Sequence, residues 1–439
     1  MPTKPDVQGA SPEHSPHDLL VSLRDLEVHF QLRTSVLARL IGGAGATVKA
    51  VDGVNLDLKR GEVLGLVGES GSGKTTLGRT LLGLVRPTSG TVEYKGVDLG
   101  SLGERRLRTM RRRLQMVFQD PHAALNPSMD LLAAIGHPLR IHGLAQSREE
   151  QRRMVSDALE RVGLTPAEQF LTKLPSELSG GQKQRAVIAR SIISGPDLLV
   201  ADEPISMLDM SVRAKILELM LELKRDLDLT YVYITHDLAT AKFFCDRVAI
   251  MYLGRIVEIG PTEEIFRDPK HPYTQALLKA VPDPDPSRQV PRDLPRGEIP
   301  DAAAPPGGCA FHPRCTLAFE PCGWEARDLR AMFERRWIKL GEDAYTNEAP
   351  LVTPLDDIAA GEQSVSLSVP SGREASELVS LLERARSDEP DDPLWRGVAG
   401  FSAAGNAVDV QFREGIEPQL IRAGTVEVAC HLHDPVLGP

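Results

Sequence analysis

Short apolar runs along the first 260 residues have the length and composition of buried strands. The runs are Val63–Val67, Leu198–Ala201 and Tyr231–Thr235. Such runs are typical of parallel strands that are covered on both faces. After the first run, Leu77, Leu81 and Leu82 recur with the spacing of one helix face. This spacing predicts a helix that begins at Lys74, directly after the first strand.

The predicted core is in two parts with a helical segment between them. Residues 20–120 and 195–260 are expected to form an α/β core with a parallel sheet and an antiparallel piece near the N-terminus. Residues 121–193 have mostly helical character, with helices expected at Gln151–Val162 and Gln182–Ile193. The pattern therefore predicts an α/β domain that carries a helical subdomain.

A different mixture of elements follows residue 322. Two helical stretches and three strand patterns are recognisable there: helices Ala326–Trp337 and Arg373–Arg386, and strands 364–369, Val408–Phe412 and Val426–Val428. The strand at 364–369 alternates as Ser-Val-Ser-Leu-Ser-Val, which is the period of a half-buried strand. This mixture predicts a small α+β domain. Two roles are open for it: sensing a ligand or regulating the rest of the chain, and serving as a stability or docking appendage.

Composition and charge narrow the class of protein. With 439 residues, the chain is long enough for two or three domains with cores of their own. The net charge is −10, and between Gly323 and Ala429 there are 20 Asp and Glu against 11 Lys and Arg. The remainder is close to neutral, which argues against a strongly basic nucleic-acid-binding protein. No apolar run approaches the roughly 20 residues of a membrane span, and residues 1–19 read as a disordered leader without the apolar core of a signal peptide.

The segment between the first strand and its helix reads GESGSGKT, from Gly68 to Thr75. It matches a phosphate-binding loop at every fixed position. Its residues, with the next threonine, are the candidate nucleotide ligands: Gly68, Glu69, Ser70, Gly71, Ser72, Gly73, Lys74, Thr75 and Thr76. We expect backbone N–H groups to face phosphate oxygens, Lys74 to lie against the β- and γ-phosphates, and Thr75 to bind Mg²⁺.

Two carboxylates end the second strand, and a histidine follows the third. Asp202 is expected to hold the magnesium shell and Glu203 to act as general base for the attacking water. His236 alone would be structural more often than catalytic. Downstream of a complete nucleotide site, it is predicted to contact the γ-phosphate.

These motifs resemble those of the ATP-binding subunits of ATP-binding cassette (ABC) transporters. GESGSGKT resembles the Walker A motif, LLVADEP at 198–204 the Walker B motif, and LSGGQKQR at 178–185 the family signature. The resemblance implies that Gln119 is the Q-loop ligand of Mg²⁺ and water and senses the membrane partner. It implies that Asp209 belongs to the D-loop and that His236 is the switch histidine. In the family an upstream aromatic residue stacks on adenine, and Phe30 is the candidate, with a strand-core role as the alternative.

The signature residues stand at a predicted helix N-terminus, which is an anion site. They are Ser179, Gly180, Gly181 and Gln182. In the family this end meets the γ-phosphate of ATP bound to an opposing subunit, so two cassettes sandwich two nucleotides. An ordinary helix cap at Ser179 is compatible with that role but does not by itself require the two glycines.

Three further stretches resemble the oligopeptide and dipeptide importers within this family. They are Asp120-Pro121, Leu125–Pro127 and Lys270–Leu278. The resemblance covers about residues 20–322 and resumes near residue 428. It implies a second ABC subunit, identical or paralogous, two transmembrane permeases, an extracytoplasmic solute-binding protein acting indirectly, and a peripheral position on the cytoplasmic face of the membrane.

Four of the five cysteines are candidate metal ligands. Cys309, Cys315 and Cys322 lie close together in a Gly- and Pro-rich stretch, and Cys430 follows much later, whereas Cys245 reads as a buried thiol. Closely spaced cysteines in a reducing compartment favour metal over a disulfide. Four thiolates could hold Zn²⁺ or a [4Fe–4S] cluster, and the resemblance to peptide-importer ATPases favours the cluster. Nearby histidines leave the ligand set open: His312, His431 and His433.

The wide separation of Cys322 and Cys430 departs from the family pattern and indicates an insertion whose ends meet near the metal. The expected parts are a leader at 1–19, the nucleotide-binding domain at 20–282 with its helical subdomain at 121–193, an extension at 283–322 and 423–439, and the inserted domain at 323–422. The function expected is an ATP-hydrolysing, energy-coupling subunit of an importer for peptides or similar solutes. Alternatives are an importer for oligosaccharides or metal complexes, and a soluble regulatory ABC ATPase.

Overall fold

The computed structural model describes residues 18–31, 47–280, 298–352, 354–355, 358 and 363–439. Nearly all of the expected leader and the domain boundary expected at 282 lie outside these residues. The chain divides into two compact units, one of residues 1–26, 55–63 and 79–232 and the other of residues 27–54, 64–78 and 233–439. The division runs through several strands, so each unit is described by itself below.

Hydrogen bonding orders the strands of the described chain into three sheets, β2-β1-β4-β5, β14-β15-β10-β9-β3-β8-β7-β6 and β11-β13-β12. In the first sheet the strands are β1 (Leu19–Gln31), β2 (Thr47–Lys59), β4 (Ser89–Tyr94) and β5 (Val97–Asp98). The pairing of β4 with β5 is antiparallel, in line with the antiparallel piece expected near the N-terminus.

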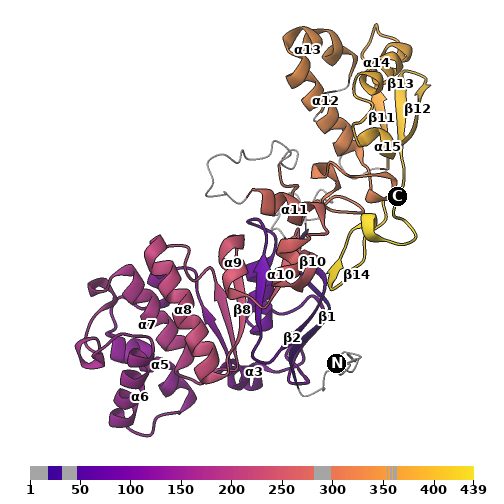
Figure 1. Cartoon of the computed structure of the whole chain (residues 1–439). Coiled ribbons are helices and arrows are strands. Elements are labelled where there is room, and N and C mark those ends of the chain that lie inside the picture. The colour runs from indigo at the N-terminus through magenta and orange to yellow at the C-terminus, as the bar shows by residue number, and fades with distance from the viewer. Residues whose placement is uncertain (1–17, 32–46, 281–297, 353, 356–357, 359–362) are drawn as a thin grey trace, which may run out of the picture. The chain divides into compact units, whose positions relative to one another are not determined.

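The first unit carries the helical subdomain (Figure 1). The main helices of the subdomain are α5 (Leu131–His142), α6 (Arg148–Arg161) and α7 (Gly180–Ile192), and α8 (Met210–Leu227) follows in the same unit. The first three pack on one another, and two of them confirm the helices expected from the sequence. Ser147 begins α6 because its side chain accepts a hydrogen bond from the Glu150 backbone. In the same unit β6 (Leu114–Val117) pairs in parallel with β7 (Leu198–Asp202), which is buried throughout.

The second unit contains the strand that leads into the phosphate loop. All five residues of β3 (Val63–Val67) are buried, and the strand pairs in parallel with β9 (Arg247–Tyr252). The helix expected from Lys74 is α2 (Lys74–Leu81), and Leu77, Leu81 and Leu82 are buried as their spacing predicts. Next to β9 lies antiparallel β10 (Arg255–Pro261). The division of the chain passes through β8 (Thr230–Thr235).

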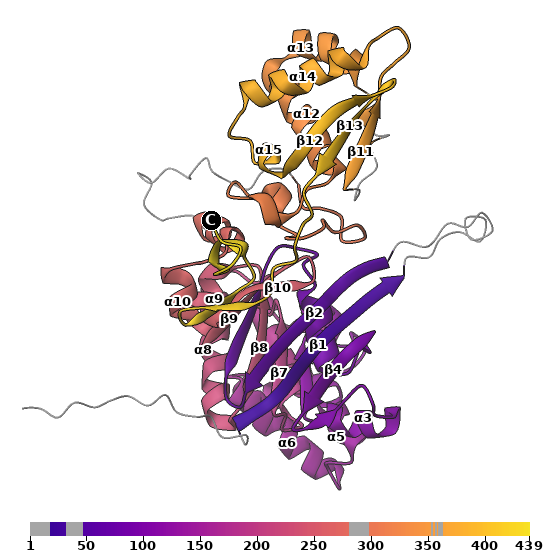
Figure 2. The ribbon, with the colours of Figure 1, turned by 90° about the vertical axis from the view of Figure 1, so that its right-hand side faces the viewer.

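The extension and the small α+β domain also belong to the second unit. Short helices α9 (Leu238–Phe244), α10 (Thr262–Arg267) and α11 (Pro272–Lys279) precede them. The α+β domain has helices α12 (Ala326–Leu340), α13 (Glu342–Glu348), α14 (Ala375–Asp388) and α15 (Leu394–Gly397) around strands β11 (Ser364–Ser368), β12 (Val398–Ala404) and β13 (Ala407–Phe412). Figure 2 shows these helices gathered against the three-stranded sheet.

Two strands differ from the sequence expectations. β12 was not predicted, because it is an edge strand rich in glycine and alanine and its side chains are mostly exposed. Val426–Val428 forms the expected strand, β15, but in a different sheet from β13. It pairs with β10, with Val428 opposite Glu258, and with β14 (Ile421–Ala423). Residues 421–428 therefore belong with the strands of the cassette rather than with the α+β domain.

The two ends of the α+β domain lie side by side. The backbone N–H of Ile416 donates to the carbonyl oxygen of Pro321 at 2.9 Å. A Cβ added to Gly415 would come within 2.4 Å of the Cα of Gly323, so only glycine allows this approach. The chain therefore leaves the α+β domain next to the point where it enters, beside Cys322.

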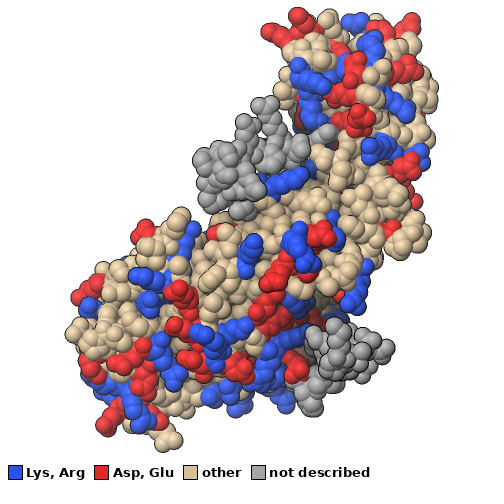
Figure 3. All heavy atoms as spheres, viewed as in Figure 1, with Lys and Arg blue, Asp and Glu red and all other residues tan. Residues whose placement is uncertain are grey.

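No helix in the described ranges has both the length and the apolar character of a membrane span. On the face drawn in Figure 3, Lys and Arg side chains are interspersed with Asp and Glu. No strongly basic surface is present on that face.

Candidate nucleotide site and cysteine cluster

The phosphate loop has the backbone shape that its glycines predict. Gly71 and Gly73 have positive φ angles of 80° and 98°, which other residues rarely adopt. The Lys74 ammonium group is buried and donates to the carbonyl oxygens of Gly68 and Glu69, both at 2.8 Å. The lysine is thus held over the loop that it is expected to serve.

Neighbouring backbone leaves no space for side chains at two loop positions. A Cβ on Gly68 would lie 2.2 Å from the carbonyl oxygen of Met251, and one on Gly73 would lie 2.0 Å from that of Ala50. The backbone N–H of Gly254 also donates to the carbonyl oxygen of Ser72 at 3.0 Å. The backbone of neighbouring segments therefore packs closely against the phosphate loop and supports its curved conformation.

In the first unit, the expected catalytic carboxylate is joined to the Q-loop. Nε2 of Gln119 donates to Oε2 of Glu203 at 3.0 Å. Glu203 has a positive φ of 45° just beyond the end of β7 and is half-buried, whereas Asp202 at the end of that strand is buried. The structure therefore brings together two of the residues that the sequence assigns to water activation.

The signature residues form the N-terminus of α7. Ser179 Oγ accepts from the Gln182 backbone at 3.3 Å, and Gln182 Oε1 accepts from the Ser179 backbone at 3.0 Å. This reciprocal capping box confirms the local role of Ser179, which is nonetheless exposed. The structure adds a packing reason for one glycine, since a Cβ on Gly181 would lie 2.8 Å from Val212 Cγ1. Gly180 has more room, since a Cβ added there would lie 3.6 Å from Leu208 Cδ2.

The D-loop and switch residues lie on exposed turns. Asp209 stands at the N-cap of α8 but makes no side-chain cap hydrogen bond there. His236 is exposed directly after β8, and the cap of α9 is made instead by its neighbour Asp237, whose side chain accepts from Ala239 and Thr240. Phe30, the candidate for adenine stacking, is 44% exposed near the end of β1, so it is not a strand-core residue.

Comparison with protein-family models assigns the chain. Residues 51–206 match the ABC transporter model. Residues 257–322 match the model of the oligopeptide/dipeptide transporter C-terminal region. A peptide import ATP-binding protein of Brucella ovis is 44% identical over 311 residues, which are 71% of this chain and 94% of that protein. The chain belongs to the ABC transporter ATP-binding family.

Other members of the ABC family match to a similar extent. The oligopeptide transport ATP-binding protein AppF of Bacillus subtilis is 44% identical over 308 residues, covering 70% of this chain and 92% of that protein. YkfD of the same organism is 42% identical over 333 residues, which are 75% of this chain and 98% of that protein. This ABC protein has the P-loop cassette fold and is an ATPase, the ATP-hydrolysing subunit that couples energy to transport.

Four of the five cysteines of this ABC ATPase lie near enough to influence one another electrostatically. They are Cys309, Cys315, Cys322 and Cys430, and we refer to them as the cysteine cluster. Burial raises the pKa of the Cys309 thiol well above its usual range, and the nearby thiols of Cys322, Cys430 and Cys315 raise it further. Burial likewise raises the pKa of Cys315 to about 12 and that of Cys430 to about 11. Such a group of buried thiols strongly resists ionisation unless a cation compensates the charge.

Backbone N–H groups point at the sulfurs of the cluster. Phe319 donates to the Sγ of Cys322 at 3.5 Å. Backbone hydrogen bonds that lower the thiol pKa also reach Cys309, Cys315 and Cys430, from Phe311, from Leu317 and Ala318, and from Leu432. Hydrogen bonds to thiolate sulfur are a regular feature of metal–cysteine sites, where they set the reduction potential. The donor set therefore fits a metal group.

The nearby histidines are occupied by other contacts. Nδ1 of His312 faces the carbonyl oxygen of Cys309 at 2.8 Å, and its Nε2 faces Asp328 Oδ2 at 3.1 Å. Nε2 of His431 and of His433 faces a backbone carbonyl oxygen in each case. Both ring nitrogens of His312 are therefore engaged by protein groups.

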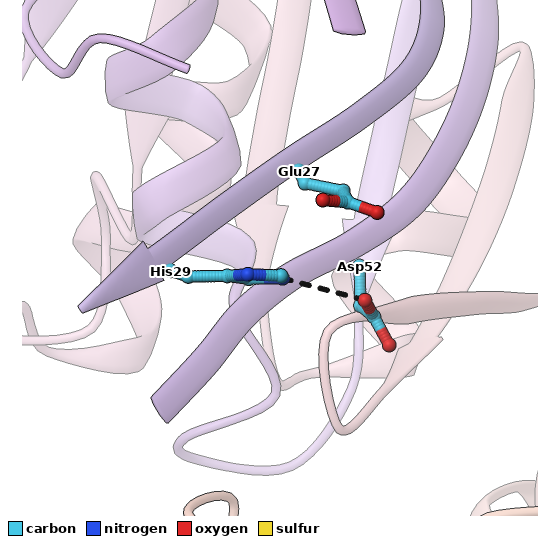
Figure 4. Close-up of side chains that lie close together, drawn as sticks. All are labelled: Glu27, His29 and Asp52. Atoms are coloured by element: carbon cyan, nitrogen blue, oxygen red, sulfur yellow. Dashed lines mark hydrogen bonds and ion pairs between the residues drawn. The ribbon is translucent and has the colours of Figure 1, made fainter. Parts of the chain in front are cut away.

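The acidic group near the N-terminus does not fit a metal site (Figure 4). Asp52 already accepts from Nη2 and Nε of Arg255 at 2.5 and 3.1 Å and lies 3.6 Å from Lys49. Burial opposes the charge of Asp52, but the Arg255 hydrogen bonds hold its pKa below the usual range. Arg255 and Lys49 already neutralise the Asp52 carboxylate, so we interpret Glu27, His29 and Asp52 as part of an ion-pair network rather than a metal site.

Sequence reasoning missed two residues that contact the phosphate loop. Tyr273 Oη accepts from the backbone N–H of Glu69 at 3.0 Å, and Arg314 forms an ion pair with the Glu69 carboxylate. Both lie within residues 257–322, which match the oligopeptide/dipeptide C-terminal model. Their distance from Glu69 along the chain, more than 200 residues, hid the contacts.

Proposed function

We propose that the phosphate loop, Gln119, Asp202, Glu203 and His236 form one Mg–ATP site. Lys74 neutralises the β- and γ-phosphates, Thr75, Gln119 and Asp202 hold Mg²⁺, and Glu203 takes a proton from the attacking water. His236 contacts the γ-phosphate and Phe30 stacks on adenine. The glycine conformations of the loop and the hydrogen bond between Gln119 and Glu203 support this assignment.

A second cassette completes the site. The exposed Ser179 and the amides at the start of α7 serve the γ-phosphate of ATP bound to another subunit, next to Asp209 of the D-loop. The partner is a second copy of this chain or a paralogue.

Crosslinking tests the two-cassette arrangement. With Mg–ATP and hydrolysis blocked, Ser179→Cys is expected to crosslink through a short bismaleimide to Ser70→Cys in the phosphate loop of a partner cassette. The crosslink should need nucleotide because ATP fills the gap between the two motifs. The control is Arg153→Cys, an equally exposed position on α6. If Ser179→Cys gives no more nucleotide-dependent crosslink than the Arg153→Cys control, the two-cassette arrangement is refuted.

The solute is most simply a peptide. The main support is that residues 257–322 match the oligopeptide/dipeptide transporter C-terminal region. In addition, AppF, which is 44% identical to this chain, is an oligopeptide transport ATP-binding protein. The chain then docks at the cytoplasmic face of the membrane on two permeases, which a binding protein supplies with solute. Oligosaccharides and metal complexes are the alternative solutes, since the cassette does not select them.

Isolation of the native complex tests the peptide assignment. Affinity-tagged full-length chain is expected to purify from membranes with two multi-spanning permeases and a second cassette, and ATP hydrolysis in liposomes should rise on addition of the binding protein loaded with peptide. Mass spectrometry of the bound solute gives the identity. Stimulation by a loaded oligosaccharide or metal complex, with none by peptide, would transfer the function to the alternative class. A chain that never associates with permeases would instead favour a soluble regulatory ATPase.

The cysteine cluster is proposed to hold [4Fe–4S], with Zn²⁺ as the alternative. Cys309, Cys315, Cys322 and Cys430 would supply thiolates, and the cluster would give a redox-active, cross-linking group that joins residues 309–322 to the C-terminal segment. Support comes from the proximity of the half-buried Cys309 to the buried Cys315, Cys322 and Cys430, and from the backbone N–H groups directed at their sulfurs.

Residues 323–422 are proposed to be an insertion into the extension. The match to the C-terminal model ends at Cys322, and the chain returns beside that residue at Gly415 and Ile416. Because the ends meet, the domain can be accommodated without displacing the cysteine cluster.

A further inference from the structure

Glu69, the second residue of the phosphate loop, is held by its side chain as well as its backbone. Nη1 of Arg314 donates to Oε2 of Glu69 at 2.7 Å, and Nη2 donates to Oε1 at 3.0 Å. The backbone N–H of the same residue donates to Tyr273 Oη at 3.0 Å. Two-pronged guanidinium–carboxylate contacts fix orientation as well as distance. Glu69 is therefore clamped by two residues, Tyr273 and Arg314, and Arg314 belongs to the C-terminal extension.

Arg314 is itself positioned by aromatic rings. Its guanidinium carbon lies 5.8 Å from the ring centres of both Tyr252 and Phe311, which are in edge-to-face contact with each other. The Arg314 side chain is only 9% exposed, against 27% for Glu69. Nη1 of Arg314 also lies 3.5 Å from Tyr252 Oη, to which it donates. Removal of either partner would leave a poorly solvated charge without its counter-ion, so the pair is costly to break.

The clamp acts on the atoms that hold Lys74. The carbonyl oxygens of Gly68 and Glu69 accept from the Lys74 ammonium group, so a movement of Glu69 displaces one of its supports. Gly68 is pressed against Met251, one residue before Tyr252. The arginine, the rings and the strand end thus support the first two residues of the loop together. A loop that is held in its binding conformation loses less entropy when a ligand binds.

We propose that Arg314 is a positioning residue for ATP binding, which makes the nucleotide affinity of the cassette depend on its C-terminal extension. Arg314 acts through Glu69 and does not touch the nucleotide. The inference rests on the ATP site proposed above. It gives the extension, including the turn that precedes Cys315, a direct role in the ATPase.

The test compares Arg314→Gln with Arg336→Gln in the full-length chain. Arg336 is a matched control because it also forms a two-pronged pair, with Glu348, at 7% exposure, within the α+β domain. We expect Arg314→Gln to raise the dissociation constant and the KM for ATP roughly tenfold, with kcat changed less than about twofold, because ground-state binding is lost. Arg336→Gln should leave both constants as in the wild type, and Arg314→Lys should recover part of the loss.

A double variant separates positioning from general destabilisation. If Arg314 acts through Glu69, Arg314→Gln with Glu69→Gln should weaken ATP binding no more than the worse single variant. Additive losses, or equal effects of Arg314→Gln and Arg336→Gln on KM, would overturn the proposal. Lys74→Ala tests the ATP site separately. If Lys74→Ala keeps the wild-type affinity for ATP, the assignment of the ATP site fails. If Lys74→Ala loses ATP affinity while Arg314→Gln binds ATP normally, only the proposed role of Arg314 is refuted.

Discussion

Glu203→Gln is expected to lower steady-state ATP hydrolysis roughly 10²- to 10⁴-fold, the usual contribution of a general base. Glutamine has nearly the same size and keeps an oxygen that can accept from Gln119 Nε2, now 3.0 Å from Glu203 Oε2. Because the glutamine side chain has the same shape, the substitution also adds no strain at this position, where φ is 45°. The variant therefore removes proton acceptance and little else. Hydrolysis is measured as phosphate release, and binding as ATP retained after gel filtration.

The retained ATP should trap a dimer of cassettes. ATP that cannot be hydrolysed continues to join the phosphate loop of one subunit to the signature of the other, so the variant should elute at twice the wild-type mass when Mg–ATP is present. Glu218→Gln, the same change of charge at an exposed position on α8, is the control and should hydrolyse normally. Turnover by Glu203→Gln within a few-fold of the wild type would remove Glu203 from the catalytic role.

Cys309→Ser is expected to remove the metal group of the cysteine cluster. Serine offers no thiolate, and the remaining three sulfurs leave one iron without its ligand. Anaerobically purified wild type should be brown, absorb near about 400 nm and contain about four irons per chain, and the variant should lose most of this absorbance and iron. ATP should still bind to the variant, because none of the phosphate-loop residues changes.

Cys245→Ser provides the matched control for that experiment. Cys245 is also buried, but it lies at the end of α9 against Gly65, outside the cysteine cluster. Its replacement should leave the iron content unchanged, so a loss restricted to Cys309→Ser identifies a ligand rather than a destabilised fold. Wild-type protein that contains one zinc and no iron would replace the iron–sulfur assignment by the zinc alternative.

Metal loss and the Arg314 clamp give different signatures. A ligand change at Cys309 acts first on iron content and absorbance, whereas Arg314→Gln acts first on ATP affinity. Arg314 and Cys315 are adjacent in the chain, so a moderate rise in the KM for ATP after metal loss would indicate that the cluster supports the clamp. The two sets of variants together measure how far the extension and the ATP site depend on each other.

The sequence by itself determined the local elements of this ABC ATPase. Glycines at 68, 71 and 73 followed by Lys74 specify one loop between a strand and a helix, since both the spacing and the conformations are local. The helices α6 and α7 and the alternating strand β11 also follow from short-range pattern. Local chemistry was sufficient wherever the interacting residues are a few positions apart.

Tertiary structure decided the contacts between distant segments. β15 lies against β10 rather than in the sheet of the α+β domain, and no pattern within three residues could reveal its partner. Gly181 has a packing role only because Val212 of α8 lies against it. Arg314 reaches Glu69 across 245 positions of sequence. Side-chain pairing at such separations depends on how the chain folds back, which residue type and local spacing do not encode.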